Sequence, residues 1–182
     1  MRKSFCININ LKIVIFLLLF CGFKAIAQNQ ASAENNVIPY DLKWSERTAL
    51  SILNKYPQAW QLDGNDKPKW DYKMGFVLSG FEKLYQKTNN KKYLNYIKDY
   101  VDGMIDSTGN IKKYDIKEYN IDYLNPGKLL FNLYEITKDS RYLQIIGKLR
   151  TQLETQPRTA SGGFWHKEIY PCLLYTSPSP RD

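Results

Sequence analysis

Two polar segments of the sequence each contain one side chain that can move a proton. Asp122 stands in Tyr119–Asn125, shortly before an Asn-Pro pair, and His166 stands in Gly162–Lys167, after two glycines. A carboxylate beside an imidazole that titrates near neutrality is suited to general acid–base chemistry. The two residues are 44 positions apart, close to the internal repeat described below. We therefore expect them to face the same opening.

Both side chains also have structural interpretations. A carboxylate directly before a helix is stabilised by the helix dipole, so Asp122 can serve as a capping residue. His166 is the only histidine of the chain, and a lone histidine can be a structural hydrogen-bonding group. The spacing of the pair favours a shared site, and the structural interpretations remain open.

Aromatic side chains surround this pair in the sequence. Trp165 precedes the histidine and follows two glycines, which let the backbone approach a partner closely. Trp70 and Tyr72 stand at the start of a predicted helix and are expected to reach the same opening from the preceding unit. Aromatic faces can stack on a ligand ring, so these three residues are candidate binding residues at that opening. In the alternative, they only close the end of the fold.

Several function classes are disfavoured by composition. One histidine and no carboxylate pair at ligand spacing argue against a metal site, and the chain has neither a phosphate-binding glycine loop nor a Gly-x-Ser-x-Gly turn, so no cofactor is expected. The net charge is +8, but four basic residues fall in the first 27 positions and the others are interspersed with acids. Nucleic acid is therefore not an expected partner.

The spacing of apolar residues predicts five helices and an all-α fold. The first begins at Trp44 and ends before Pro57, and the others cover 71–87, 90–105, 126–136 and 139–154. Asn125 is predicted to cap the fourth helix, with Pro126 in its first turn. Gly75 and Gly80 are predicted to mark close approaches within the second helix.

An internal repeat relates the helices to one another. The pattern Leu-Tyr-x-x-Thr-x-x-x-Lys/Arg-Tyr-Leu occurs at 84–94 and again at 133–143, an offset of 49 residues. Each copy covers the end of one helix, a tight turn and the start of the next, so the unit is a helical hairpin that must stack on copies of itself. The long connections 107–124 and 156–171 then lie at one end of the stack, where function is expected.

The two ends of the sequence differ from the rest. Basic residues, an apolar run and Ala25-Ile26-Ala27 predict a signal peptide over 1–27, cleaved after Ala27, and therefore a secreted or periplasmic protein without a permanent membrane anchor. Residues 28–39 are predicted to be a flexible leader. Residues 172–182 have no helical or strand periodicity and contain two prolines, so we expect a non-native, adapter-derived tail. The globular part is then 40–171, and no disulfide holds it together.

Several motifs resemble glycoside hydrolase family 105, the unsaturated rhamnogalacturonyl hydrolases. They are Trp70–Gly75, Ile121-Asp122, the turn 137–143, Gln156–Thr159, Gly162–Lys167 and Tyr170-Pro171. The resemblance covers about 44–171. It implies an (α/α)6 toroid of six helical hairpins, of which this chain supplies about the first half.

The resemblance also implies a reaction in pectin degradation. The family hydrates the enol-ether double bond of 4,5-unsaturated galacturonyl-rhamnose oligosaccharides, which differs from hydrolysis by two carboxylates at an acetal. By resemblance, Asp122 is the second, tuning carboxylate and His166 contacts the substrate. Trp70 and Tyr72 line the sugar subsite. The expected partner is thus an unsaturated oligosaccharide.

One departure from the family pattern bears on activity. The family's principal acid/base aspartate would fall at position 177, where this chain has Ser177. We therefore expect the chain itself to be an incomplete, inactive part of the parent enzyme. Two alternatives remain: an unsaturated glucuronyl hydrolase of the neighbouring family, and a non-catalytic helical-repeat binding protein.

Overall fold

The computed structural model describes residues 37–64 and 67–170. The predicted signal peptide, the leader as far as residue 36 and the predicted tail with Ser177 lie outside the described residues. All of the described helices belong to the unit that begins at Leu42.

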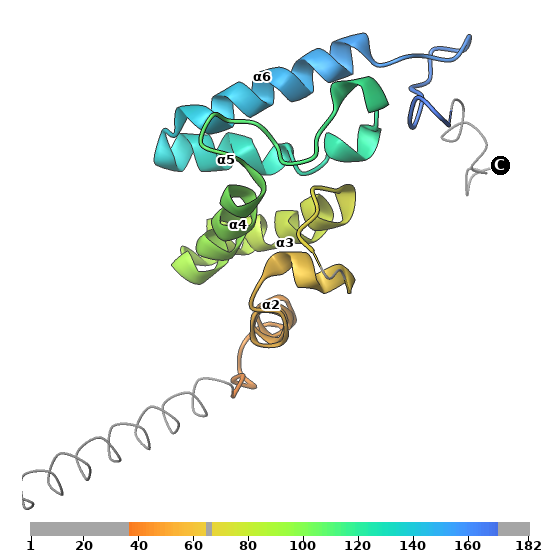
Figure 1. Cartoon of the computed structure of the whole chain (residues 1–182). Coiled ribbons are helices and arrows are strands. Elements are labelled where there is room, and N and C mark those ends of the chain that lie inside the picture. Colours follow the sequence, from red (N-terminus) through yellow and green to blue (C-terminus); the bar gives the residue numbers. More distant parts are fainter. Residues whose placement is uncertain (1–36, 65–66, 171–182) are drawn as a thin grey trace, which may run out of the picture. The chain divides into compact units, whose positions relative to one another are not determined.

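Helices dominate the described part of the chain, as the sequence predicts (Figure 1). Only isolated bridges, and no strand, occur within 37–64 and 67–170. Over the same residues, no helix combines the length and the apolar character that a bilayer span requires. The elements are α2 Trp44–Lys55, η1 Ala59–Asp63, α3 Tyr72–Thr88, α4 Lys91–Met104, η2 Ile116–Glu118, η3 Ile121–Tyr123, α5 Lys128–Thr137 and α6 Ser140–Thr155.

The sequence repeat corresponds to two hairpins, α3–α4 and α5–α6, whose helices pack in pairs (Figure 1). In each hairpin a threonine ends the first helix by donating its hydroxyl to the carbonyl four residues earlier. The distances are 2.7 Å from Thr88 to Leu84 and 2.7 Å from Thr137 to Leu133. The repeated threonine thus bonds back to its own helix, a local side-chain-to-backbone contact that is the same in both copies.

The turn after the threonine is also the same in both copies. Asn89 and Lys138 adopt left-handed conformations, with φ of 53° and 57°, and each ends its helix with a backbone bond to the residue four positions earlier. Asn90 and Asp139 then cap the next helix through their side chains. The internal repeat thus encodes a complete helix–turn–helix connection.

The core is continuous across both hairpins. Tyr93 and Tyr142 occupy equivalent positions of the repeat and are both fully buried. Phe81 of α3 packs edge-on against Tyr93, with ring centroids 6.0 Å apart. The aliphatic centre comes from all four helices of the two hairpins, with these fully buried residues: Leu78, Ile97, Val101, Leu129, Leu130, Leu133 and Ile145.

The prediction that Asn125 caps the fourth helix is wrong. The backbone N–H of Gly127 donates to the carbonyl of Leu124 over 3.1 Å, so Asn125 and Pro126 form a turn and α5 begins only at Lys128. The helix has no side-chain cap. Instead the backbone carbonyl of Asn125 accepts from the amide of Lys128 over 3.3 Å.

Only one of the two glycines in α3 lies where another segment approaches too closely for a side chain. A Cβ on Gly75 would lie 2.5 Å from Oδ1 of Asn125 and 2.6 Å from the nitrogen of Pro126. Helix α3 therefore packs directly against the turn that follows Asp122. A Cβ on Gly80 would meet no heavy atom within 4 Å, so the predicted close approach does not occur there among the described residues.

Candidate active site

The two long connections meet, as the repeat predicts. The backbone N–H of Ile121 donates to the carbonyl of His166 over 3.0 Å, and that of Glu168 donates to the carbonyl of Glu118 over 2.9 Å. These two bonds align the segment before α5 with the segment after α6. Residues far apart in the sequence are thereby fixed side by side at one end of the hairpins.

Asp122 and His166 face each other within this arrangement. Nε2 of His166 lies 3.2 Å from Oδ1 of Asp122, and the side chains are 18% and 24% exposed, respectively. An ionised carboxylate only accepts hydrogen bonds, so Nε2 carries the proton and donates it. Nδ1 of His166 is buried and has no hydrogen-bond partner among the described residues.

Local structure sets the direction of Asp122. The residue lies in the short helix η3, whose first turn is capped by Asn120: the side-chain oxygen of Asn120 accepts from the backbone N–H of Asp122 over 3.1 Å. The carboxylate of Asp122 is thus a neighbour of His166, while α5 has no side-chain cap. The capping interpretation of Asp122 is not supported at that helix.

Two buried glutamines at the C-terminal end of α6, Gln152 within the helix and Gln156 directly after it, bind the backbone of both long connections. Nε2 of Gln156 donates to the carbonyls of Tyr119 and Trp165, over 2.5 and 2.9 Å. Nε2 of Gln152 donates to the carbonyl of Asn120 over 3.0 Å, and also to Oε1 of Gln156 over 3.2 Å. Since both side chains are buried, these bonds are shielded from water and fix the register of the loops.

A partly buried tyrosine completes the glutamine network. The hydroxyl of Tyr114 donates to Oε1 of Gln152 over 2.8 Å, and its ring packs edge-on against Tyr123 at 5.5 Å. Burial raises the pKa of Tyr114 to about 12. The phenol therefore remains protonated at neutral pH and keeps its role as a donor.

Sequence reasoning missed Gln152, although a signal for it existed. Tyr142, Ile145, Leu149 and Gln152 follow one another at helical spacing, and all four are buried. A glutamine in an otherwise apolar stripe must satisfy its amide inside the protein. Gln156 belonged to a recognised motif but had no predicted role.

Trp70 is a buried residue that packs against α4. Its side chain is 3% exposed, its ring stacks on Tyr100 at 6.1 Å with an interplanar angle of 7°, and its indole N–H donates to the carbonyl of Tyr123 over 2.8 Å. This packing supports the structural interpretation of Trp70. The hydrogen bond also ties the start of α3 to the residue after Asp122.

The other two aromatic candidates differ in exposure. Tyr72, the first residue of α3, is 46% exposed, and no hydrogen bond or ring contact between described residues links it to Asp122 or His166. Trp165 is half-buried, and its backbone N–H donates to the carbonyl of Pro157 over 2.9 Å. Of the predicted residues, the structure joins Asp122 and His166 directly, and it ties Trp70 to the carbonyl of Tyr123.

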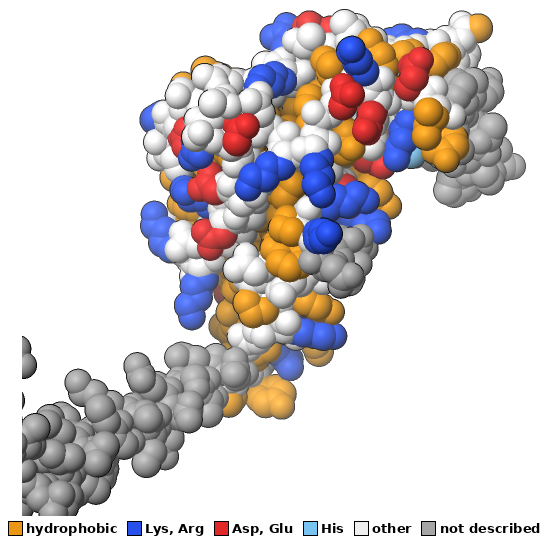
Figure 2. Space-filling view, viewed as in Figure 1, with side chains coloured by type: hydrophobic (Ala, Val, Ile, Leu, Met, Phe, Trp, Pro, Cys, Tyr) orange, Lys and Arg blue, Asp and Glu red, His pale blue; other side chains and the backbone are white. Residues whose placement is uncertain are grey.

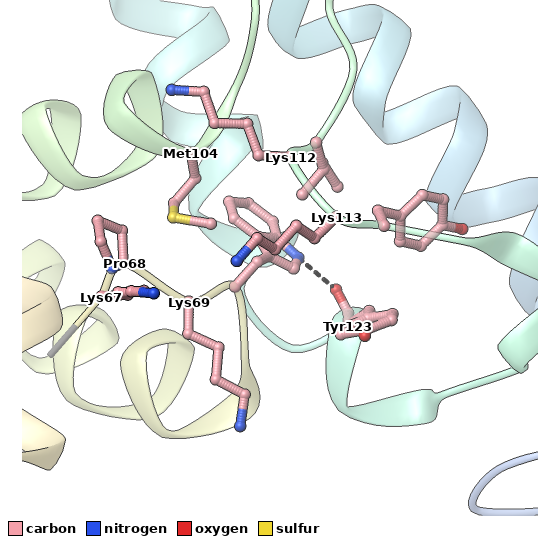
Figure 3. Close-up of a pocket in the computed structure, with 10 residues that line it drawn as sticks. Lys67, Pro68, Lys69, Met104, Lys112, Lys113 and Tyr123 are labelled. Atoms are coloured by element: carbon pink, nitrogen blue, oxygen red, sulfur yellow. Dashed lines mark hydrogen bonds between the residues drawn. The ribbon is translucent and has the colours of Figure 1, made fainter. Parts of the chain in front are cut away.

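A pocket of about 540 Å³ lies beside Tyr123 (Figure 3). It is lined by four lysines and by Trp70 and Tyr123, among others: the lysines are Lys67, Lys69, Lys112 and Lys113. Sequence reasoning missed it, because its two basic segments, Lys67–Trp70 and Lys112–Tyr114, are distant in the sequence. Its lining includes neither Asp122 nor His166.

The Asp122–His166 pair joins a carboxylate to an imidazole, which can transfer protons and stabilise charge. Among the described residues, no group of three or more His, Cys, Asp or Glu side chains could hold a metal ion.

Comparison with known proteins connects this geometry to an enzyme family. The family model described as Glycosyl Hydrolase Family 88 matches residues 44–174. The chain is 26% identical over 127 residues to the unsaturated rhamnogalacturonyl hydrolase YesR of Bacillus subtilis (strain 168), covering 69% of this chain and 34% of that protein.

A solved structure agrees with the predicted fold. A Clostridium acetobutylicum ATCC 824 protein, described as a glycoside hydrolase from family 105, superposes with a TM-score of 0.64 and 38% sequence identity, covering 71% of this chain and 34% of that chain. The predicted resemblance to family 105 and the all-α, (α/α)6-type fold are confirmed by these matches. The chain spans about a third of the length of both relatives.

Proposed function

This chain belongs to glycosyl hydrolase family 88, and from that membership we propose that it forms part of an unsaturated rhamnogalacturonyl hydrolase. The substrate is a 4,5-unsaturated galacturonyl-rhamnose oligosaccharide released during pectin degradation. Support comes from the name of the relative YesR and from the motifs shared with family 105. Because the chain spans about a third of these relatives, the proposal concerns the longer enzyme.

The juxtaposition of Asp122 and His166 is the observation that carries this proposal. Hydration adds a proton at C4 of the unsaturated uronate and a water oxygen at C5. The resulting hemiketal opens and releases the neighbouring sugar. Positive charge develops at C5 during protonation, and the Asp122 carboxylate is suited to stabilise it. The imidazole of His166, 3.2 Å away, fixes the position of that carboxylate.

A chimeric enzyme tests the proposal. Residues 44–170 replace the matching segment of the Clostridium acetobutylicum relative, and activity is followed as the loss of ultraviolet absorbance of an unsaturated rhamnogalacturonan disaccharide. We expect turnover by the chimera, and a fall of roughly 10²–10⁴-fold in kcat for Asp122→Asn. Asp115→Asn is the matched control, since Asp115 only caps η2, and it should leave kcat nearly unchanged.

Two results would contradict this proposal. A folded chimera that hydrates the disaccharide equally well with Asp122→Asn would remove Asp122 from the reaction. A folded chimera that prefers an unsaturated glucuronyl disaccharide would place the parent enzyme with the neighbouring activity. Circular dichroism and thermal unfolding of each chimera establish that it is folded.

The chain alone is proposed to be inactive, because by resemblance the principal acid/base falls at Ser177. Incubation of the full chain with the same disaccharide should give no measurable loss of absorbance. Turnover near that of the chimera would contradict this.

Export is the remaining part of the proposal. It is supported by the basic and apolar composition of residues 1–27. Expression in a Gram-negative host should yield a periplasmic product whose mass corresponds to cleavage after Ala27. An uncleaved product in the cytoplasm would contradict it.

A further inference from the structure

The lysine-lined pocket combines positive charge with an apolar floor. Lysines of two segments, Lys67–Lys69 and Lys112–Lys113, line it together with Trp70, Met104 and Tyr123, and Figure 3 shows the side chain of Lys113 extending across it. No acidic side chain lines it among the described residues. In the space-filling view, basic side chains gather around hydrophobic ones on the visible face (Figure 2).

Among the described residues, two of the four lysines have a partner in the protein and two have none. Nζ of Lys69 lies 3.4 Å from Oδ2 of Asp71, and Nζ of Lys112 donates to the carbonyl of Gly103 over 2.8 Å. In Figure 3 these two side chains point in opposite directions, whereas Lys113 extends across the pocket. No described residue pairs with the ammonium group of Lys67 or Lys113.

The walls of the pocket are held in place by backbone interactions. The hydroxyl of Tyr100 donates to the carbonyl of Lys69 over 2.8 Å. On the other side, the N–H of Lys112 donates to the carbonyl of Met104 over 2.8 Å, and Lys113 is held in a left-handed conformation with φ of 62°. Binding to such a preformed site costs less ordering of the chain.

The lining selects a class of ligand. The volume of about 540 Å³ falls within the usual range for small-molecule sites, roughly 300–1,000 Å³. Two available ammonium groups favour an anion, and the Trp70–Met104 floor favours a ligand that also has an apolar face. A sugar ring bearing a carboxylate has both properties, whereas a compact anion such as phosphate has only the first.

We propose that this pocket is an accessory subsite for a uronate residue of an acidic oligosaccharide. Tyr123, whose carbonyl accepts the bond from Trp70 in the pocket, directly follows Asp122. A saccharide chain longer than a disaccharide can thus place one uronate here and another at the Asp122–His166 pair. This inference rests on the proposed function and extends it to the recognition of longer acidic chains.

Calorimetric titration of the full chain with trigalacturonic acid tests the subsite. A charge-assisted hydrogen bond contributes about 1.5–3 kcal/mol, so Lys67→Glu combined with Lys113→Glu should weaken binding by more than about tenfold. The matched control is Lys87→Glu combined with Lys92→Glu, two exposed lysines at the opposite, turn end of α3–α4. It should change the affinity less than about twofold.

Further ligands separate a uronate site from a general anion site. Methyl-esterified trigalacturonate should bind much more weakly than the acid, and inorganic phosphate should not compete at concentrations similar to those of the trisaccharide. Equal binding of the ester, full competition by phosphate, unchanged binding by the pocket variant, or no binding by the unaltered chain would each overturn the subsite. Circular dichroism of the variants confirms that they are folded.

The subsite and the proposed function can fail separately. In the full chain, Asp122→Asn should leave trigalacturonate affinity within about twofold if the pocket carries most of the binding. If only the subsite proposal is wrong, the chimera turns over the disaccharide and the lysine substitutions do not change the affinity for trigalacturonate. If only the proposed function is wrong, the lysine substitutions weaken trigalacturonate binding and the chimera shows no turnover.

Discussion

At the scale of single residues, the site depends on which nitrogen of His166 carries the proton. The only histidine of the chain gives a single imidazole spin system, so its tautomer can be read directly. Because the carboxylate of Asp122 accepts from Nε2, we predict the Nε2–H tautomer of the neutral imidazole. Long-range ¹H–¹⁵N correlation measures this, and Asp122→Leu should remove the preference. A dominant Nδ1–H form in the unaltered chain would contradict the geometry.

The buried amide of Gln152 leads to a second prediction. In Gln152→Leu, the hydroxyl of Tyr114 and the carbonyl of Asn120 lose their buried partner. Each unsatisfied group costs about 1–3 kcal/mol, so we expect the free energy of unfolding to fall by more than about 2 kcal/mol. Denaturant unfolding measures it, and the imidazole signal of His166 should shift as the loops lose their register.

The neighbouring threonine provides the control for this substitution. Thr151 is exposed, and its hydroxyl bonds only to the carbonyl of Gly147. Thr151→Ala should change stability by less than about 0.5 kcal/mol. Equal effects of the two substitutions would mean that Gln152 does not hold the loops.

At the scale of elements, the sequence predicted what is determined locally. The five helices and the repeated turn follow from apolar spacing and the repeat, and the caps that the structure adds at Asn90 and Asp139 have partners only two residues away. The cap at Asn125 was predicted wrongly. Asn125 and Pro126 instead form a turn that packs against Gly75 of the distant helix α3. Local rules fail where packing against another element determines the backbone.

The two glycines of α3 offer a matched pair of substitutions. A Cβ at Gly75 would overlap Asn125 and Pro126, so Gly75→Ala should destabilise the protein by about 1–3 kcal/mol. Gly80 is exposed with open space around it, so Gly80→Ala should instead stabilise the helix by about 0.5–1 kcal/mol. Thermal unfolding checks both signs, and a stabilising Gly75→Ala would contradict the close approach.

The connection after α4 predicts a dependence on pH. Hydrogen bonds from the backbone N–H of Asn110 and the hydroxyl of Thr108 lower the pKa of Asp106 to about 2 from 3.8. Since the folded pKa lies below the unfolded one, the stabilisation is fully present above pH 3.8 and is lost as pH falls toward about 2. The Tm difference between the unaltered chain and Asp106→Ala should shrink over this range, and a difference that grows instead would contradict it.

At the scale of the whole molecule, the candidate site is a product of long-range contacts. The pairing of Asp122 with His166 could be anticipated, because the repeat places both connections at one end. The glutamine network and the lysine pocket could not, because each joins segments more than 30 residues apart whose proximity no local pattern encodes. The catalytic roles of Asp122 and His166 and the substrate roles of Trp70, Tyr72 and Trp165 stay predictions.

The outer face of α5–α6 suggests how the chain behaves in solution. Phe131 is 59% exposed and lines an apolar groove with Ile146, Leu149 and Leu153. Such a surface favours self-association. We predict that Phe131→Ser combined with Leu153→Ser reduces concentration-dependent association in analytical ultracentrifugation. Lys138→Ser, far along the same hairpin, is the control, and equal association of all variants would contradict the role of this face.

The two turns that follow Thr88 and Thr137 can form while the polypeptide is still being translated. Every bond that closes a turn lies within a few neighbouring positions, so loop closure costs little entropy and is fast. Each helical hairpin can therefore fold as it emerges from the ribosome. The glutamine contacts, in contrast, must wait until the end of α6 has been synthesised, so the reactive pair is assembled last.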